Sequence, residues 1–241
     1  MLLRRILNWG LGYALILLGI LSVFLFGEKT IPAMNAEEFV YKRKCIIIDA
    51  GHGGVDGGAT SCTGVLESQL NLQIALRLED LLHLVGLDTV MIRRADVSVY
   101  TEGESIAAKK ISDLKERVRI VNSTDDAVLI SIHQNTFSDP RYSGAQVFYA
   151  TSEGSQKLAR AMQQALVESL NPESNRKAKK GSSIYLLEKI KNTGVLVECG
   201  FLSNGREEAL LQQPDYQKKI VCAIAGTLSH YLSGGDWNYE V

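Results

Sequence analysis

The sequence has no excess of charge of either sign. Its 241 residues include 26 Lys and Arg against 27 Asp and Glu, for a formal net charge of −1. A protein that binds nucleic acid through its phosphates needs a basic surface, so nucleic acid is excluded as a partner. Internal repeats are also missing. The apolar fraction of 46% and the charged fraction of 22% are typical of a globular chain, which excludes wholesale disorder.

Cysteine is scarce and scattered. Cys45, Cys62, Cys199 and Cys222 lie far apart and no C-x-x-C pair occurs, which argues against a cysteine zinc site. In an exported protein four cysteines can form disulfides, and this alternative stays open. Because Cys45 and Cys222 lie in apolar runs, we instead expect unpaired and mostly buried thiols.

The N-terminus departs from the globular pattern. Residues 6–26 carry no charge and follow Arg4 and Arg5. As a helix this segment would span roughly 31 Å, enough for a bilayer core of about 30 Å. The apolar core of a signal peptide is usually shorter, and Met34 occupies the −3 position of the best cleavage candidate, Ala36. We therefore expect an uncleaved transmembrane anchor rather than a cleaved signal peptide.

Both alternatives imply the same orientation. The two arginines hold residues 1–5 in the cytoplasm, so the rest of the chain is exported. Residues 27–43 are a polar linker, the folded domain is expected at 44–235, and a tail follows at 236–241. The predicted location is the cell membrane, with the folded domain on the extracytoplasmic side.

Apolar runs typical of buried strands alternate with amphipathic segments typical of helices along 44–235. Ser112 is the expected cap of the second helix, and Gly86 ends the first. The connections are long enough for crossover helices, so we predict a single α/β domain with a mainly parallel central sheet and helices on both faces. Strands are expected at 46–48, 88–93, 127–133, 145–150, 183–187 and 194–201, and helices at 67–86, 112–122, 154–170, 206–212 and 215–233.

A glycine-rich loop follows the first strand, in the segment IDAGHGGVDGGA. Open α/β folds bind ligands at the carboxyl ends of their parallel strands. This loop does not fit a phosphate cradle, because Asp56 stands where a dinucleotide fingerprint requires glycine and Ala59 where a P-loop requires lysine. Nucleotide binding is therefore disfavoured. The glycines are expected to clear space beside His52 for another ligand.

Three residues at the ends of strands and helices predict a metal site. His52 follows the first strand, His133 ends the third, and Glu67 opens the first helix. Parallel strands bring their carboxyl ends to one edge of the sheet, where the glycine-rich loop can carry Glu67 back to the histidines. Two imidazoles and one carboxylate with an open fourth position form a common catalytic zinc set. Asp49 or Asp56 is a candidate hydrogen-bond partner for a histidine ring.

A fourth candidate, Glu198, ends a buried strand directly after the apolar residues 195–197. A carboxylate in such a place needs a partner. A base beside a metal-activated water would explain it, and a carboxylate held by loop amides or an arginine is the alternative. A cysteine hydrolase built from Cys199 and His133 is disfavoured, because it leaves Glu67 and Glu198 without roles.

Several ordered motifs together resemble one enzyme family. IDAGHGGVDGGA with Glu67, then LISIHQN, then VLVECGFLSN look like the zinc-dependent N-acetylmuramoyl-L-alanine amidases of the amidase-3 type, over about residues 44–233. The resemblance implies Zn²⁺ bound by His52, Glu67 and His133, with Glu198 as the catalytic glutamate. It also implies the reaction, hydrolysis of the amide between N-acetylmuramic acid and the first L-alanine of the peptidoglycan stem peptide.

Two features of the sequence differ from some members of this family and indicate which subgroup it resembles. The helix at Ser155 follows the strand at 145–150 almost at once, which leaves no room for the autoinhibitory helix of some relatives, and wall-binding repeats are absent from this sequence. A lone catalytic domain behind a membrane anchor is similar to the sporulation-type (CwlD-like) amidases. This implies spore cortex maturation and muramic δ-lactam formation, in the space around the forespore. A catalytically silent wall- or partner-binding module and a zinc peptidase of the same architecture are the alternatives.

The expected partners are peptidoglycan and, through the N-terminal helix, the membrane; an activating protein partner is left open. The basic loop at 174–181 either contacts anionic wall polymers or is simply solvated. Arg93, Arg94 and Arg117 match positions of the resembled family, as substrate contacts or as structural ion pairs.

Overall fold

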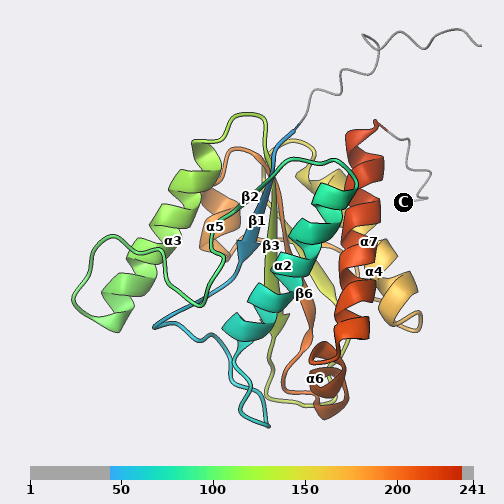
Figure 1. Ribbon diagram of the computed structural model, residues 1–241. Helices are drawn as coiled ribbons and strands as arrows, with labels where there is room; N and C mark the ends of the chain where they lie inside the picture. The colour runs from blue at the N-terminus through green and yellow to red at the C-terminus, as the bar shows by residue number, and fades with distance from the viewer. Residues whose placement is uncertain (1–43, 235–241) are drawn as a thin grey trace, which may run out of the picture. The chain divides into compact units, whose positions relative to one another are not determined.

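The structure, a computed structural model, describes residues 44–234. One sheet of six strands has the order β2-β1-β3-β6-β4-β5 (Figure 1). The strands are β1 (Ile46–Ala50), β2 (Thr89–Met91), β3 (Val128–Asn135), β4 (Gln146–Tyr149), β5 (Lys179–Lys180) and β6 (Thr193–Phe201). The helices are α2 (Glu67–Leu84), α3 (Ile106–Asn122), α4 (Ser155–Leu170), α5 (Tyr185–Lys189), α6 (Gly205–Leu211) and α7 (Pro214–Leu232).

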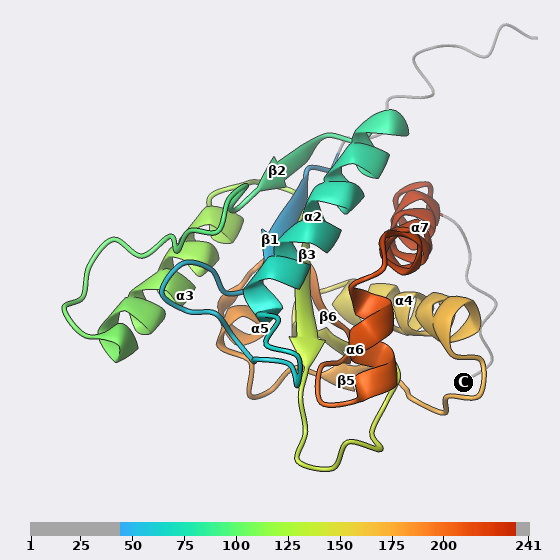
Figure 2. The same ribbon diagram turned by 60° about the horizontal axis from the view of Figure 1, so that its bottom comes forward.

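Both faces of the sheet are covered, as the isoleucine run of β1 predicted. Ile46 and Ile48 point into a core formed with α2, α4 and α7. Ile47 points to the opposite face, into a smaller core that includes residues of α3 and α5. Figures 1 and 2 show these two groups of helices on either side of the strands. A strand buried on both faces needs apolar residues at every position, which explains the unbroken run.

The sheet is mainly parallel, as predicted, but one antiparallel pair makes it mixed. β2, β1, β3 and β6 are parallel neighbours, whereas β4 is antiparallel to β6 and β5 runs parallel to β4. The connection at 136–145 contains no helix. A parallel return generally needs a crossover, often a helix, so the strand after this loop runs in the opposite direction.

The predicted strand at 183–187 is wrong, because this region contains the five-residue helix α5. Leu186 and Leu187 are buried in the core that α3 also joins. A short apolar run is compatible with a strand and with a buried helical turn, which is why a strand was wrongly predicted here.

The start of α3 was also predicted wrongly. The helix begins at Ile106, and Ser105 caps it by accepting a hydrogen bond from the backbone N–H of Ala108 at 3.1 Å. Ser112 lies inside the helix, where its hydroxyl accepts hydrogen bonds from the backbone N–H groups of Thr101 and Glu102. The preceding loop is thereby tied to the helix.

All four cysteines lie in the described range, and each is an unpaired thiol as expected. The expectation that most are buried is wrong, since of the four only Cys199 is buried and Cys62 and Cys222 are exposed. Cys222 follows an apolar pair in the sequence but lies on an exposed position of α7, because a helix turns successive residues to different faces.

Between residues 44 and 234, no helix combines the length and the apolar character needed to cross a membrane. The predicted cytoplasmic segment 1–5, anchor 6–26, linker 27–43 and tail 236–241 lie outside the described residues.

Candidate metal centre and active site

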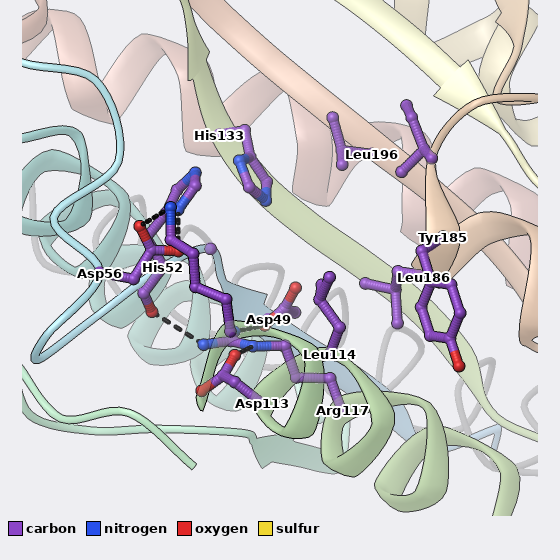
Figure 3. Close-up of a pocket in the computed structure, with 13 residues that line it drawn as sticks. Asp49, His52, Asp56, Asp113, Leu114, Arg117, His133, Tyr185, Leu186 and Leu196 are labelled. Carbon is purple, nitrogen blue, oxygen red and sulfur yellow. Dashed lines mark hydrogen bonds and ion pairs between the residues drawn. The ribbon is translucent and has the colours of Figure 1, made fainter. Parts of the chain in front are cut away.

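The three predicted ligands converge at the carboxyl ends of β1 and β3. His52 follows β1, His133 lies near the end of β3, and Glu67 is the first residue of α2. One ligand atom from each lies within 4.8 Å of the other two. The rings of His52 and His133 meet edge to face, with centroids 5.0 Å apart. Figure 3 shows both histidines at the same end of a pocket, with Asp56 beside His52.

The carboxylate of Glu67 bridges the two histidines. Its Oε2 lies 3.2 Å from His52 Nε2, and its Oε1 lies 2.9 Å from His133 Nδ1. The backbone N–H groups of Ala59 and Gln134 donate to the same two oxygens. Burial disfavours the charged form, but hydrogen bonds and charges from His133 and His52 outweigh it and hold the pKa of Glu67 well below its ordinary value. Glu67 is therefore a candidate anionic ligand.

His52 has an unusual backbone and a strongly polarised ring. Its φ of 60° lies in the left-handed region, which side chains rarely adopt outside sites that require it. Its Nδ1 lies 2.8 Å from Asp56 Oδ2. Burial opposes protonation, yet Glu67 and Asp56 raise the pKa of His52 to about 9. The site thus attracts positive charge, as a cation site must.

Two glycines make room for the ligands. A Cβ atom at Gly51 would stand 2.2 Å from Nε2 of His133. A Cβ atom at Gly58 would stand 2.6 Å from Oε2 of Glu67 and 2.8 Å from Cδ2 of His52. A side chain at Gly51 would displace His133, and one at Gly58 would displace Glu67 or His52, so these two glycines make room for the candidate ligands themselves.

Glu198 lies beside the three candidate ligands. It is the register partner of His133 in the neighbouring strand, so the two side chains leave the sheet on the same face. Its Oε2 is buried and has no hydrogen-bond partner, neither a loop amide nor an arginine, among the described residues. Burial, with the negative charge of Glu67 adding to it, raises the pKa of Glu198 to about 7. Such a carboxyl group can accept and return a proton near neutral pH.

Cys199 does not fit the role of a nucleophile. Its side chain is fully buried, and burial, together with the charge of Glu198, raises the pKa of the thiol well above its ordinary value. The nucleophilic form of cysteine is the thiolate. The cysteine-hydrolase hypothesis is therefore disfavoured by the structure as well.

Arg93 and Arg117 hold the turn that carries His52. Arg93 donates to the carbonyl oxygens of Ala50 and Gly51 at 2.8 and 2.9 Å. Arg117 donates to the carbonyl oxygens of Ala50 and His52 at 3.1 and 2.8 Å. Three consecutive carbonyl groups thus accept from two buried guanidinium groups. Arg93 and Arg117 therefore have structural roles. Arg94, the third arginine of the prediction, forms an ion pair with Glu79 of α2.

Of the two candidate partners for a histidine ring, Asp56 bonds to His52 and Asp49 does not. Asp49 instead pairs with Arg117 and accepts a hydrogen bond from Ser131 Oγ at 2.7 Å. Arg117 also pairs with Asp113, with 2.6 Å between Nε and Oδ2. Asp49 is therefore buried away from the histidine rings, and it supports the site indirectly by pairing with Arg117, which holds the backbone of His52.

We expect Asp49→Asn to destabilise the fold by about 3 kcal/mol at neutral pH, because Arg117 loses a buried partner. Burial disfavours the Asp49 carboxylate, but Arg117, His133 and Ser131 outweigh it and lower its pKa. A carboxylate with a lowered folded-state pKa stabilises the fold above its unfolded-state pKa of about 3.9 and loses that contribution as the pH falls through the folded-state pKa. Urea unfolding from neutral to acid pH should show the two proteins converging in acid.

The control for this prediction is Asp215→Asn, which changes an exposed aspartate whose carboxylate lies 3.0 Å from Lys218 Nζ. Because Asp215 is exposed and solvent screens its pair with Lys218, this variant should change the pH dependence of the unfolding free energy far less than Asp49→Asn does. A constant difference between Asp49→Asn and wild type at every pH would contradict the assignment.

Sequence reasoning missed several residues that support the site. Asn71 donates to the carbonyl of Gly51 at 3.1 Å and accepts from Gln134 Nε2 at 3.2 Å. Its position four residues after Glu67, on the same face of α2, is a signal that could have identified it. Lys110 lies 2.8 Å from Asp56 Oδ1, and no pattern in the sequence indicates that contact.

A pocket of about 260 Å³ opens beside His52 and His133, between the glycine-rich loop, α3 and α5. Its apolar lining includes Leu114, Leu186 and Leu196 (Figure 3). The helix α5, where a strand was predicted, thus forms one wall of the pocket.

Comparison with known proteins places these features in a family. The family profile described as N-acetylmuramoyl-L-alanine amidase (Amidase_3) matches residues 46–230. The germination-specific N-acetylmuramoyl-L-alanine amidase of Bacillus subtilis (strain 168) is 34% identical over 236 residues, covering 97% of this chain and 98% of the relative. The amidase AmiA of Escherichia coli (strain K12) is 26% identical over 235 residues, covering 78% of this chain and 76% of the relative.

Solved structures agree with the sequence relatives. The CwlD amidase from Clostridioides difficile, in complex with the GerS lipoprotein, matches with a TM-score of 0.76 at 37% identity, covering 79% of this chain and 99% of that one. The catalytic domain of the amidase CwlV from Bacillus (Paenibacillus) polymyxa matches with a TM-score of 0.63 at 29% identity, covering 79% and 98%. The chain therefore belongs to the N-acetylmuramoyl-L-alanine amidase family of the amidase-3 type and is an enzyme of that class.

Proposed function

We propose that this chain uses zinc to hydrolyse the amide bond between N-acetylmuramic acid and L-alanine in peptidoglycan. The observation that carries the proposal is the convergence of His52, Glu67 and His133 beside the unpaired, buried oxygen of Glu198. Membership of the amidase family supports the choice of bond.

The residues fit zinc better than a hard cation. Two imidazole nitrogens and one carboxylate oxygen leave a fourth position for water or substrate, which is a common catalytic zinc set, whereas Ca²⁺ and Mg²⁺ prefer oxygen ligands. Asp56 at the other nitrogen of His52 gives the support that zinc-binding histidines usually have. The absence of side chains at Gly51 and Gly58 lets His133, Glu67 and His52 come together, because a Cβ at either position would clash with them.

A zinc ion held by these residues would polarise the scissile carbonyl and lower the pKa of a water molecule. Glu198 accepts the proton of the attacking water and returns it to the amide nitrogen as the bond to carbon breaks. The lactyl group then leaves as a carboxylate and the stem peptide as a free amine. Asp56 keeps the ring of His52 oriented during these steps.

The proposal extends to spore cortex maturation through muramic δ-lactam formation. It is supported by the germination-specific relative, which this chain matches over almost its whole length. It is also supported by the short connection between β4, which ends at Tyr149, and α4, which begins at Ser155. This connection leaves no room for the autoinhibitory helix that some members of the family carry, which is the feature that resembles the sporulation-type amidases. Since the CwlD relative was solved with a lipoprotein, we include a lipoprotein partner in the proposal. The membrane anchor and the extracytoplasmic location are proposed from residues 6–26 alone.

The test uses the full-length protein, purified in detergent, with its zinc content measured by elemental analysis. Incubation with muropeptides followed by mass spectrometry should yield glycan separated from stem peptides that begin with L-alanine. Cleavage within the stem peptide would identify a peptidase instead. A folded, zinc-loaded protein that leaves muropeptides intact even in the presence of a lipoprotein partner would identify a silent binding module.

Replacing His52 or His133 with alanine is expected to lower zinc affinity by at least about 100-fold, since each supplies one of three protein ligands. Equilibrium dialysis against a zinc chelator measures this. His83→Ala is the control, because His83 lies on the exposed side of α2 and contacts Thr89. If neither substitution reduces zinc binding, the metal site lies elsewhere.

A further inference from the structure

The pocket beside the metal ligands has an apolar wall and a cationic side chain. Leu114, Leu186 and Leu196 form part of the wall, and Lys110 of α3 is among the lining residues. The side chain of Lys110 is 48% exposed, and its Nζ lies 2.8 Å from Asp56 Oδ1. The ammonium group is therefore open to solvent and also lies next to Asp56, which contacts the ring of His52.

The other charged residues of the pocket, apart from Asp56, are already paired. Asp49 accepts from Ser131 and Arg117, and Asp113 accepts from Arg117 and from the backbone N–H of Val99. The guanidinium of Arg117 is occupied by these carboxylates and by backbone carbonyl groups.

Lys110 differs from these groups in its spare donors. An ammonium group has three N–H donors, and the contact with Asp56 uses one of them. Asp56 in turn is shared with His52 Nδ1 and the backbone N–H of Gly58. Lys110 is thus the pocket cation with donors left for an anionic ligand.

We propose that this pocket holds the stem-peptide side of the scissile amide, and that Lys110 binds the carboxylate of the residue after L-alanine. This rests on the proposed function. The volume of about 260 Å³ suits one limb of the substrate rather than the whole, since pockets for complete small ligands have about 300–1,000 Å³. The leucine wall fits the alanine methyl group, whereas sugar hydroxyl groups would lose their hydrogen bonds against it.

The chemistry of the second stem residue makes the proposal specific. If the second stem residue is a glutamate that is linked to the next residue through its side-chain carboxyl group, its α-carboxylate is free and negatively charged. Amidation of this α-carboxylate removes the charge. A charge-assisted hydrogen bond from Lys110 distinguishes the two forms, because a carboxamide offers only a neutral acceptor. Lys110 is then a residue that determines substrate specificity.

The experiment compares two synthetic muropeptides that differ only in a carboxylate or a primary carboxamide at this position. Full-length wild type should cleave the carboxylate form with a roughly three- to tenfold lower KM, as expected for a half-exposed charged contact. Lys110→Met keeps the aliphatic stem and removes the charge. It should raise KM for the carboxylate substrate by the same factor, leave KM for the carboxamide substrate unchanged, and so abolish the discrimination.

The neighbouring Lys109 provides the matched control. Its Nζ lies over the ring of Tyr100, 5.1 Å from the centroid, and it is not among the pocket residues. Lys109→Met should keep the wild-type preference between the two substrates. Zinc content is measured for each variant, because Lys110 also contacts the aspartate that supports His52.

Two results would overturn the inference. An equal loss of kcat/KM for both substrates in Lys110→Met would show that Lys110 acts only through Asp56 and His52. Equal cleavage of both substrates by wild type would show that the carboxylate is not bound here. Either result leaves the proposed amidase activity intact, whereas failure of wild type to cleave any muropeptide would count against the proposed function itself.

Discussion

Replacing Glu198 with glutamine is expected to lower kcat by about 10²–10⁴-fold while zinc stays bound. Glutamine has nearly the same shape as glutamate, but its amide cannot accept the proton of the attacking water. The side chain of Glu198 is not needed as a ligand, since His52, Glu67 and His133 already converge without it. Steady-state kinetics on muropeptides and zinc analysis of the same preparation together measure the effect.

The matched control is Glu168→Gln, which changes an exposed glutamate of α4 that accepts a hydrogen bond from Gln164 Nε2 at 2.8 Å. It should keep wild-type kcat. Activity close to wild type in Glu198→Gln would remove Glu198 from the proposed mechanism. Loss of zinc in that variant would instead make Glu198 a ligand, and the proton would then need another acceptor.

A single methyl group at position 51 is expected to destroy the metal centre. The Cβ of Gly51→Ala would stand 2.2 Å from Nε2 and 2.3 Å from Cε1 of His133, so the imidazole must leave its place. The backbone of Gly51 is not in the left-handed region, and alanine is therefore strained only by this contact. We expect zinc affinity to fall by about 100-fold or more, and cleavage to fall with it.

Gly57→Ala is the control from the same loop. A Cβ there would approach only the flexible end of the Leu66 side chain, at 3.3 Å. This variant should bind zinc as wild type does, in the same chelator competition. Unchanged zinc binding by Gly51→Ala would mean that His133 is not a ligand in the position that the structure gives it.

The main elements of the fold were predictable because the pattern of apolar residues in the sequence shows which positions of a strand or helix are buried. The isoleucines of β1 and the apolar runs that lead to His133 and Glu198 are covered on both faces, and α2 shows one apolar face. The direction of β4 was not predictable in the same way, because a buried strand has the same apolar residues in either direction. What decides it is the helix-free connection before the strand.

The candidate ligands could be predicted from their places at element ends, but their supports could not. Asp49 and Asp56 carry the same carboxyl group and lie on either side of His52, only a few residues away in sequence. Only the fold separates them, since Asp49 is inside β1 and faces Arg117 whereas the loop returns Asp56 to the histidine. The contact of Lys110 with Asp56 joins residues far apart in sequence, with no pattern to announce it.

The reversal of β4 determines which part of the active-site rim is free to change during evolution. Because Gln146 at the start of β4 pairs with Glu198, the connection 136–145 leaves and re-enters the sheet at the edge that carries the proposed site. Doubling the length of such a loop costs only about 0.6 kcal/mol in closure entropy. The glycine-rich loop, by contrast, cannot accept one methyl group at Gly51 or Gly58. New substrate contacts can therefore arise by insertion at 136–145 while the ligand geometry stays fixed.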